Sequence, residues 1–281
     1  GSTVAASFDN YSDPNRTFYV LLPAQSAGTT VKYIFYISDG DLASSWGMID
    51  SGNGYVTSWD EGSISPFSYN VFSEISSNTT WDDSTTLPLT RYDLTSNATL
   101  TLDNADFNIS DLSVYNGALV IEPSASIDIS GTLTIFSSGT VTAKSNSLES
   151  ASLITNSRSG PGSTNFYYEK YVAANDTTND LIAPPFAGLS FTNTLANNPG
   201  VIKQDPSDST KYLFGPFDND NGIYLTYDSD TDGNQTMGVG KGYRVGTISG
   251  GGTVTFRGLF QNGNVGVLTS KGGHNLYGRW N

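Results

Sequence analysis

The sequence predicts an all-β protein in which a short right-handed parallel β-helix lies between two antiparallel parts. Three observations predict it. Only 14% of the 281 residues are charged, so Ser, Thr, Asn and Gly must supply the polar surface, and this composition suits short strands and turns. Short apolar alternations recur about every 20 residues in the middle of the chain, as in a solenoid. Longer alternating segments lie on either side of them.

Charge and composition also limit the possible functions. The chain has 27 acidic and 13 basic residues, a net charge of −14 at pH 7, and such a surface repels nucleic acid and anionic lipid. No apolar run approaches the ~20 residues of a membrane-spanning helix, so we expect no membrane insertion. The absence of cysteine excludes disulfides and thiolate zinc sites. In a secreted protein, it fits a bacterial surface.

Residues 1–75 are expected to form one module of antiparallel strands, with alternating apolar patterns over residues 17–22, 31–37 and 66–72. The stretch LLPAQSAGTTVKYIFYISDG, residues 21–40, resembles the late strands of immunoglobulin-like modules attached to secreted bacterial enzymes and adhesins. The resemblance implies a partial immunoglobulin-like sandwich that lacks its early strands. We therefore expect the chain to be a piece of a longer protein.

Residues 76–94 are polar and are expected to be a linker, and residues 95–158 carry the repeat. Its apolar positions predict nine strands in three coils: Leu100 and Leu102, Phe107 and Ile109, Leu112 and Val114, Leu119 and Ile121, Ile127 and Ile129, Leu133 and Ile135, Val141 and Ala143, Leu148, and Leu153 with Ile154. Each coil would bury one apolar stripe against its neighbours. A meander sandwich with similarly spaced hairpins remains an alternative.

Residues 159–281 return to longer strands separated by glycine-rich turns, which predicts an antiparallel β-sandwich that would continue beyond the last residue. The segments YEKYV, GIYLTYD, GVGKGYRVGT and GTVTFRGLFQNGNVGV follow the solenoid in this order. The series resembles a module of very large secreted and cell-surface proteins of the Bacteroidota, and GKGYRV, residues 240–245, is its most specific part. Many of those proteins leave by type IX secretion and act as adhesins or matrix components. The resemblance implies an extracellular location and no reaction.

One segment has the pattern of a metal-binding loop. Oxygen-bearing side chains occupy every second position at Asp228, Asp230, Asp232 and Asn234, and a glycine stands between the last two. This spacing is typical of the start of a calcium loop. An EF-hand loop has a glutamate at its twelfth position, where this chain has Val239, so another carboxylate such as Asp218 or Asp220 would be needed. A solvated turn is the alternative.

Catalysis is not expected. The chain has one histidine, His274, which is too few for a histidine metal site, and no nucleophile-elbow sequence accompanies it. No glycine-rich sequence stands between a strand and a helix, as phosphate and dinucleotide binding require. The acidic residues cluster in turns, where solvation rather than pKa tuning is the default.

Two further patterns indicate binding or modification. Trp46 and Trp59 in the first module have flat rings that could stack on sugars, although packing in a core is the alternative. Three triplets match the Asp-Ser/Thr-small pattern that Bacteroidota O-glycosylate, and they make Ser84, Thr177 and Ser209 candidate glycan carriers of a glycoprotein.

The sequence therefore supports two functions. The first is a non-catalytic structural or adhesive segment of a large bacterial extracellular or cell-surface protein, with other copies or other modules of a surface assembly as partners. The alternative is a carbohydrate-binding accessory region attached to a secreted polysaccharide-degrading enzyme. Calcium is the one cofactor that either hypothesis would include.

Overall fold

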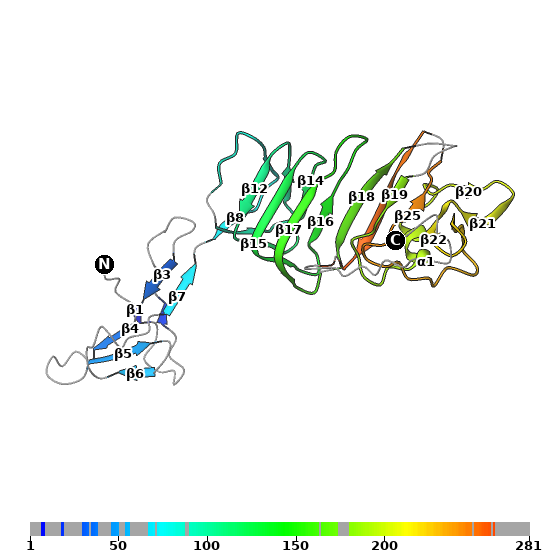
Figure 1. Ribbon diagram of the computed structural model, residues 1–281. Coiled ribbons are helices and arrows are strands. Elements are labelled where there is room, and N and C mark those ends of the chain that lie inside the picture. Colours follow the sequence, from blue (N-terminus) through cyan, green and yellow to red (C-terminus); the bar gives the residue numbers. More distant parts are fainter. Residues whose placement is uncertain are drawn as a thin grey trace. The chain divides into compact units, whose positions relative to one another are not determined.

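The computed structural model is almost entirely β-structure (Figure 1). It describes residues 72–261 except 88–89, 163, 174–179, 249 and 260, together with short strands within residues 1–71. The chain divides into two compact units, Gly1–Val71 and Phe72–Asn281.

The described strands of the first unit pair in an antiparallel manner. They are β1 (Ser7–Phe8), β2 (Phe18–Tyr19), β3 (Thr30–Tyr33), β4 (Phe35–Ser38), β5 (Trp46–Asp50), β6 (Gly54–Val56) and β7 (Phe67–Asn70). β1 pairs with β2, β3 pairs with β7, and β4, β5 and β6 form a three-stranded sheet. The antiparallel pairing agrees with the sequence, and the immunoglobulin-like packing stays a prediction.

The second unit begins with a parallel β-solenoid of about 4 turns (Figure 1). Strands of successive turns pair in parallel and build three faces. Face 1 contains β8 (Ser73–Ile75), β10 (Arg91–Leu94), β13 (Asp111–Val114) and the C-terminal parts of β15 (Ser126–Ile135) and β17 (Ser152–Ser159). Face 2 contains β9 (Thr79–Trp81), β11 (Thr99–Leu102), β14 (Ala118–Ile121), β16 (Thr140–Ala143) and β18 (Phe166–Val172). Face 3 contains β12 (Asp106–Ile109) and the N-terminal parts of β15 and β17.

The interior of the solenoid is filled by side chains that repeat from turn to turn. Leu100, Leu119 and Val141 occupy the same register position on face 2 and are fully buried. The apolar pairs predicted from Leu100 to Ala143 all lie in parallel strands and are all buried. The structure therefore confirms the parallel solenoid and excludes the meander sandwich.

The prediction for Leu148 is wrong. This residue is 90% exposed and lies in a turn in which the N–H groups of Leu148 and Glu149 both donate to Oδ1 of Asn146 at 2.8 Å. Such local side-chain bonds compete with strand formation. The turn lengthens the last coil, so Leu153 follows Ile127 on face 3, while Ile154 points outward and is 60% exposed.

Parallel stacking begins earlier than the sequence suggests. β8, β9 and β10 already pair with later turns, although β9 and β10 lie in the segment expected to be a linker. β9 has Thr79 at the position that Leu100 occupies one turn later, so it lacks the apolar pair that marks the other strands. The Trp81 ring packs there against Tyr92 and Phe107, with centroid distances of 5.0 and 5.7 Å.

The last part of this unit, the C-terminal module, contains antiparallel sheets and one short helix within the described residues. β18 pairs on one edge with β16 of the solenoid and on the other with β26 (Gly252–Gly258), so one six-stranded sheet runs through both parts. A four-stranded sheet has the order β19 (Asp180–Ile182), β25 (Tyr243–Val245), β22 (Phe214–Asp218) and β23 (Ile223–Tyr224). A three-stranded sheet has the order β20 (Gln204–Asp205), β21 (Asp208–Tyr212) and β24 (Tyr227–Asp228).

The helix α1 (Phe191–Asn197) has a sequence signal at its start. Ser190 is its N-cap, and its hydroxyl oxygen accepts a hydrogen bond from the N–H of Asn193 at 3.2 Å. The helix places Phe191 in a cluster of buried rings, 5.4 Å from Phe214 and 5.2 Å from Tyr227. This aromatic cluster is the core of the C-terminal module.

Candidate functional site

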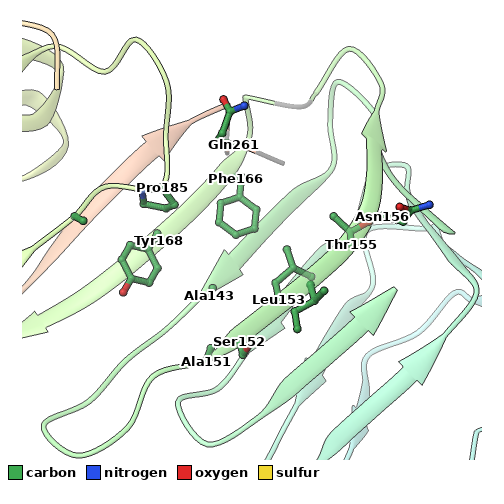
Figure 2. Close-up of a pocket in the computed structure, with 12 residues that line it drawn as sticks. Ala143, Ala151, Ser152, Leu153, Thr155, Asn156, Phe166, Tyr168, Pro185 and Gln261 are labelled. Atoms are coloured by element: carbon green, nitrogen blue, oxygen red, sulfur yellow. The ribbon is translucent and has the colours of Figure 1, made fainter. Parts of the chain in front are cut away.

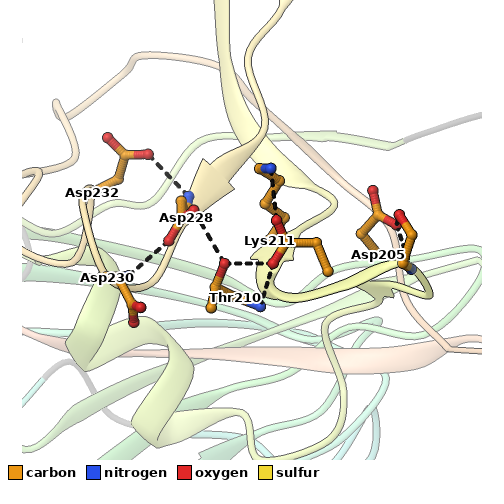
Figure 3. A network of polar contacts seen from close by, with 8 residues as sticks. Asp205, Thr210, Lys211, Asp228, Asp230 and Asp232 are labelled. Carbon is orange, nitrogen blue, oxygen red and sulfur yellow. Dashed lines mark hydrogen bonds and ion pairs between the residues drawn. The ribbon is translucent and has the colours of Figure 1, made fainter.

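The predicted calcium loop forms a tight turn directly after β24 (Figure 3). The N–H of Asp228 donates to Oδ2 of Asp232, and the N–H of Asp230 donates to Oδ1 of Asp228, both at 2.9 Å. The other oxygen of Asp228 accepts a bond from the Thr210 hydroxyl at 3.1 Å. The carboxylates of Asp228 and Asp232 therefore stabilise the turn as hydrogen-bond acceptors.

A second acidic turn lies beside this loop, in the hairpin of β20 and β21 (Figure 3). The Asp208 carboxylate accepts from the ammonium group of Lys211 at 2.7 Å and from the hydroxyl of Thr210 at 2.7 Å. These bonds lower the pKa of Asp208 to about 2, and the bond from Lys211 is the largest cause. Asp205 accepts from the hydroxyl of Ser207 at 2.6 Å, which lowers its pKa as well.

One of the two further carboxylates considered for the loop is also used locally. Asp218 accepts bonds from the side chain and N–H of Asn221 and from the N–H of Asp220, and these bonds lower its pKa. Across the described part of the chain, no three His, Asp or Glu side chains gather as metal ligands would. Calcium binding by Asp228, Asp230, Asp232 and Asn234 stays a prediction.

A cavity of about 610 Å³ lies where the solenoid meets the C-terminal module (Figure 2). Its lining includes Leu153 of β17 and Phe166 and Tyr168 of β18. The fold explains its position. β18 extends face 2 by one strand, but among the described residues no strand follows β17 on face 3, so Leu153 is covered by the preceding turn on one side only.

The groups that line this cavity limit its chemistry. Tyr168 is the one titratable side chain among the described lining residues, and burial raises its pKa, so its phenol stays protonated at neutral pH. Ser152, Asn156 and Gln261 add neutral polar atoms. The described part of the lining suits an apolar group and contains neither a carboxylate nor an imidazole.

A polar cluster on the outer side of face 1 was not expected from the sequence. Arg91 donates to the carboxylate of Asp93 at 3.0 Å and to the hydroxyls of Ser113 and Tyr115 at 3.3 and 3.4 Å. The bond to Asp93 is the main cause of the raised pKa of Arg91. The Tyr115 ring stacks on Phe136, one turn further along, at 4.2 Å. The repeat period could have predicted this cluster, since Asp93 and Ser113 share one register position.

Two candidate glycan carriers lie on the described surface. Ser84 is exposed, and its hydroxyl donates to Asp82 at 2.6 Å, which lowers the pKa of that carboxyl. Ser209 is exposed on β21. Thr177 and Trp59 lie outside the described residues, and Trp46 begins β5 with its side chain outside the described part. Of the two described carriers, Ser84 follows β9 in the solenoid and Ser209 lies in the C-terminal module.

Comparison with known proteins gives no further identification. No protein-family model matches the chain, and neither a curated protein nor a solved structure is significantly similar to it. Among the described residues, no helix has the length and apolar character needed to cross a membrane.

Proposed function

We propose that the chain is a non-catalytic structural or adhesive segment of a large bacterial extracellular or cell-surface protein, in which the solenoid is a rigid spacer. One observation carries the proposal. The sheet that forms face 2 does not end with the solenoid but continues through β18 into β26 of the C-terminal module. The solenoid and the module are therefore joined by backbone hydrogen bonds and not by a loose linker.

Contacts between successive turns support the same function. On the outside, the hydroxyls of Thr132 and Ser157 lie 2.6 Å apart, and those of Thr134 and Ser159 lie 2.8 Å apart. The side chain of Asn165 donates to the carbonyls of the turn before it at 2.9 and 3.2 Å. Because each turn is held to its neighbours in this way, bending the solenoid would break contacts on several faces.

The chemistry of the described surface agrees with a non-catalytic function. The carboxylates with lowered pKa values, such as Asp208 and Asp218, lie in exposed turns and accept bonds from neighbouring groups. A catalytic acid or base normally has a pKa near the working pH and lies in a cleft. The groups that line the described cavity do not meet this condition.

The extracellular location and the adhesin-like partners rest on the sequence resemblance. The segment GKGYRV and its neighbours resemble modules of Bacteroidota surface proteins, so we propose other copies or other modules of a surface assembly as partners. The low content of charged residues and the absence of cysteine are compatible with that setting.

Single-molecule force measurements test the rigid spacer. The full chain would be pulled between two marker domains of known unfolding length. We expect the solenoid and the C-terminal module to unfold together in one event, because they share a sheet. Release of the C-terminal module at low force, before the solenoid, would contradict the proposal.

A polysaccharide pull-down separates this function from the carbohydrate-binding alternative. We expect the full chain to bind none of the common plant and microbial polysaccharides. Binding that is lost in Trp46→Ala or Trp59→Ala, but kept in the exposed control variant Leu148→Ala, would favour the alternative.

A further inference from the structure

The outer side of the four-stranded sheet in the C-terminal module has an arginine that forms no ion pair with a described carboxylate. Arg244 lies in β25, between Leu181 of β19 and Gly215 of β22. Its neighbours Tyr243 and Val245 are 1% and 0% exposed, so Arg244 projects from the opposite side of the sheet. This residue is the arginine of the GKGYRV sequence.

The described contacts of the guanidinium group are with uncharged groups. Its Nη2 donates to the carbonyl of Leu225 at 3.2 Å and to the hydroxyl of Thr226 at 2.9 Å. Its central carbon lies 5.6 Å from the ring centroid of Tyr224. Nε is buried and has no hydrogen-bond partner in the described part of the chain. Burial lowers the pKa of Arg244, and none of the ion pairs between described residues includes it.

Exposed aliphatic side chains flank this charge. Leu181 is 55% exposed and Leu225 is 38% exposed, and the Tyr224 ring is fixed edge-on against Phe217 at 5.0 Å. A side chain at Gly215 would collide with the Leu225 carbonyl, so glycine lets the segment after β23 lie flat on the sheet. These contacts form a surface, called the Arg244 surface, that consists of Leu181, Phe217, Tyr224, Leu225 and Arg244.

We propose that the Arg244 surface binds a polypeptide segment that presents an Asp or Glu side chain between aliphatic side chains. A carboxylate would compensate a charge that is already partly desolvated, and a charge-assisted hydrogen bond is the stronger kind. The exposed leucines favour a polypeptide over an acidic polysaccharide, because aliphatic partners remove their apolar surface from water and sugar hydroxyls do not. The inference is independent of the proposed structural role, since it concerns the chemistry of one surface.

Nuclear magnetic resonance of the full chain tests this proposal. The ¹⁵N signal of Arg244 Nε, assigned by its loss in Arg244→Lys, would be followed during titration with the capped peptides Leu-Glu-Leu and Leu-Gln-Leu. We expect the Glu peptide to shift this signal and to bind at least about tenfold more tightly than its Gln counterpart, since a hydrogen bond to a carboxylate is stronger than one to a neutral amide. Leu181→Ser should weaken binding of the Glu peptide and leave the backbone spectrum unchanged.

Arg257 is the matched control in the same titration. Its guanidinium also lies over a tyrosine ring, 5.2 Å from Tyr167, but it donates to the Asn165 side chain at 2.9 Å. Equal shifts of Arg244 and Arg257, equal binding of the two peptides, or no shift at all would overturn the proposal. Tighter binding of trigalacturonate than of the Glu peptide would assign the surface to an acidic polysaccharide instead. The main readout uses the unmodified chain and does not depend on the folding of a variant.

Discussion

In the solenoid, a buried side chain has a similar one at the same position one turn away, as Leu100, Leu119 and Val141 do on face 2. In the C-terminal module, the buried rings come from elements that do not repeat: Phe191 lies on α1 and Phe214 on β22. The solenoid core is thus a series of similar layers, whereas the module core is a single cluster. We expect damage to remain local in the first and to spread in the second.

β18 is the element in which the two kinds of core meet. It continues the parallel face of the solenoid, yet its rings pack on the C-terminal module, with Phe166 5.7 Å from Phe186 and Tyr168 6.4 Å from Phe256. The shared sheet couples the two parts through this strand. Substitutions on either side of β18 therefore test how far each core depends on it.

The largest effect is expected from Phe214→Ala. Phe214 is fully buried and lies 5.4, 5.5 and 6.1 Å from the rings of Phe191, Tyr243 and Tyr227. Removal of such a ring costs about 3–5 kcal/mol of unfolding free energy, and urea denaturation followed by circular dichroism measures it. Leu181→Ala, at a residue 55% exposed, is the control and should change stability by less than about 0.5 kcal/mol. A loss below about 1 kcal/mol for Phe214→Ala would show that the aromatic cluster is not a single core.

Alanine substitutions at two positions in one register of the solenoid should cost different amounts of unfolding free energy. Ile127 and Leu153 are neighbours on face 3, but Ile127 is 1% exposed and Leu153 borders the cavity. Ile127→Ala is expected to cost about 2–5 kcal/mol, and Leu153→Ala markedly less, because the space around Leu153 is already incompletely filled. Equal losses in urea denaturation would mean that the last turn is as tightly packed as the interior.

The difference between the two cores also explains what could be predicted from the sequence. Leu119 and Ile127 could be placed in the solenoid because similar residues recur one period apart, and this recurrence shows which positions pair. β9 was missed because Thr79 takes an apolar position, and Leu148 was misplaced because an apolar residue in a turn looks like one in a strand. The cluster of Arg91 with Ser113 follows the repeat period and not a local pattern. The Arg244 surface joins residues distant in sequence, so neither kind of pattern points to it.

A smaller loss of stability is expected from a substitution where the helix of the C-terminal module meets the shared sheet. Asn198 is 3% exposed, donates to the carbonyls of Thr194 and Thr255 at 2.7 and 2.8 Å, and accepts from the N–H of Thr255 at 2.6 Å. Asn198→Ala leaves buried partners unsatisfied and should cost about 1–3 kcal/mol. Hydrogen exchange should show the loss of protection in α1 and β26 and not in β11 or β14. Loss of protection along the whole solenoid would contradict this local opening.

The smallest effect on stability is expected at the exposed turn of Asp208, which lies outside both cores. Its hydrogen bonds lower the pKa from 3.8 to about 2, so they favour the folded state above pH 3.8 and this contribution is lost as the pH falls from 3.8 towards about 2. Lys211→Met removes the first cause and should bring the pKa of Asp208 back towards 3.8 in a carboxyl ¹³C titration. Asp218, whose pKa is lowered by Asn221, is the internal control and should not change. Because the Lys211 pair is solvent-exposed, its effect on unfolding should be slight. A clear drop in the stability of the solenoid upon Lys211→Met would mean that surface turns of the module act on the distant core through β18.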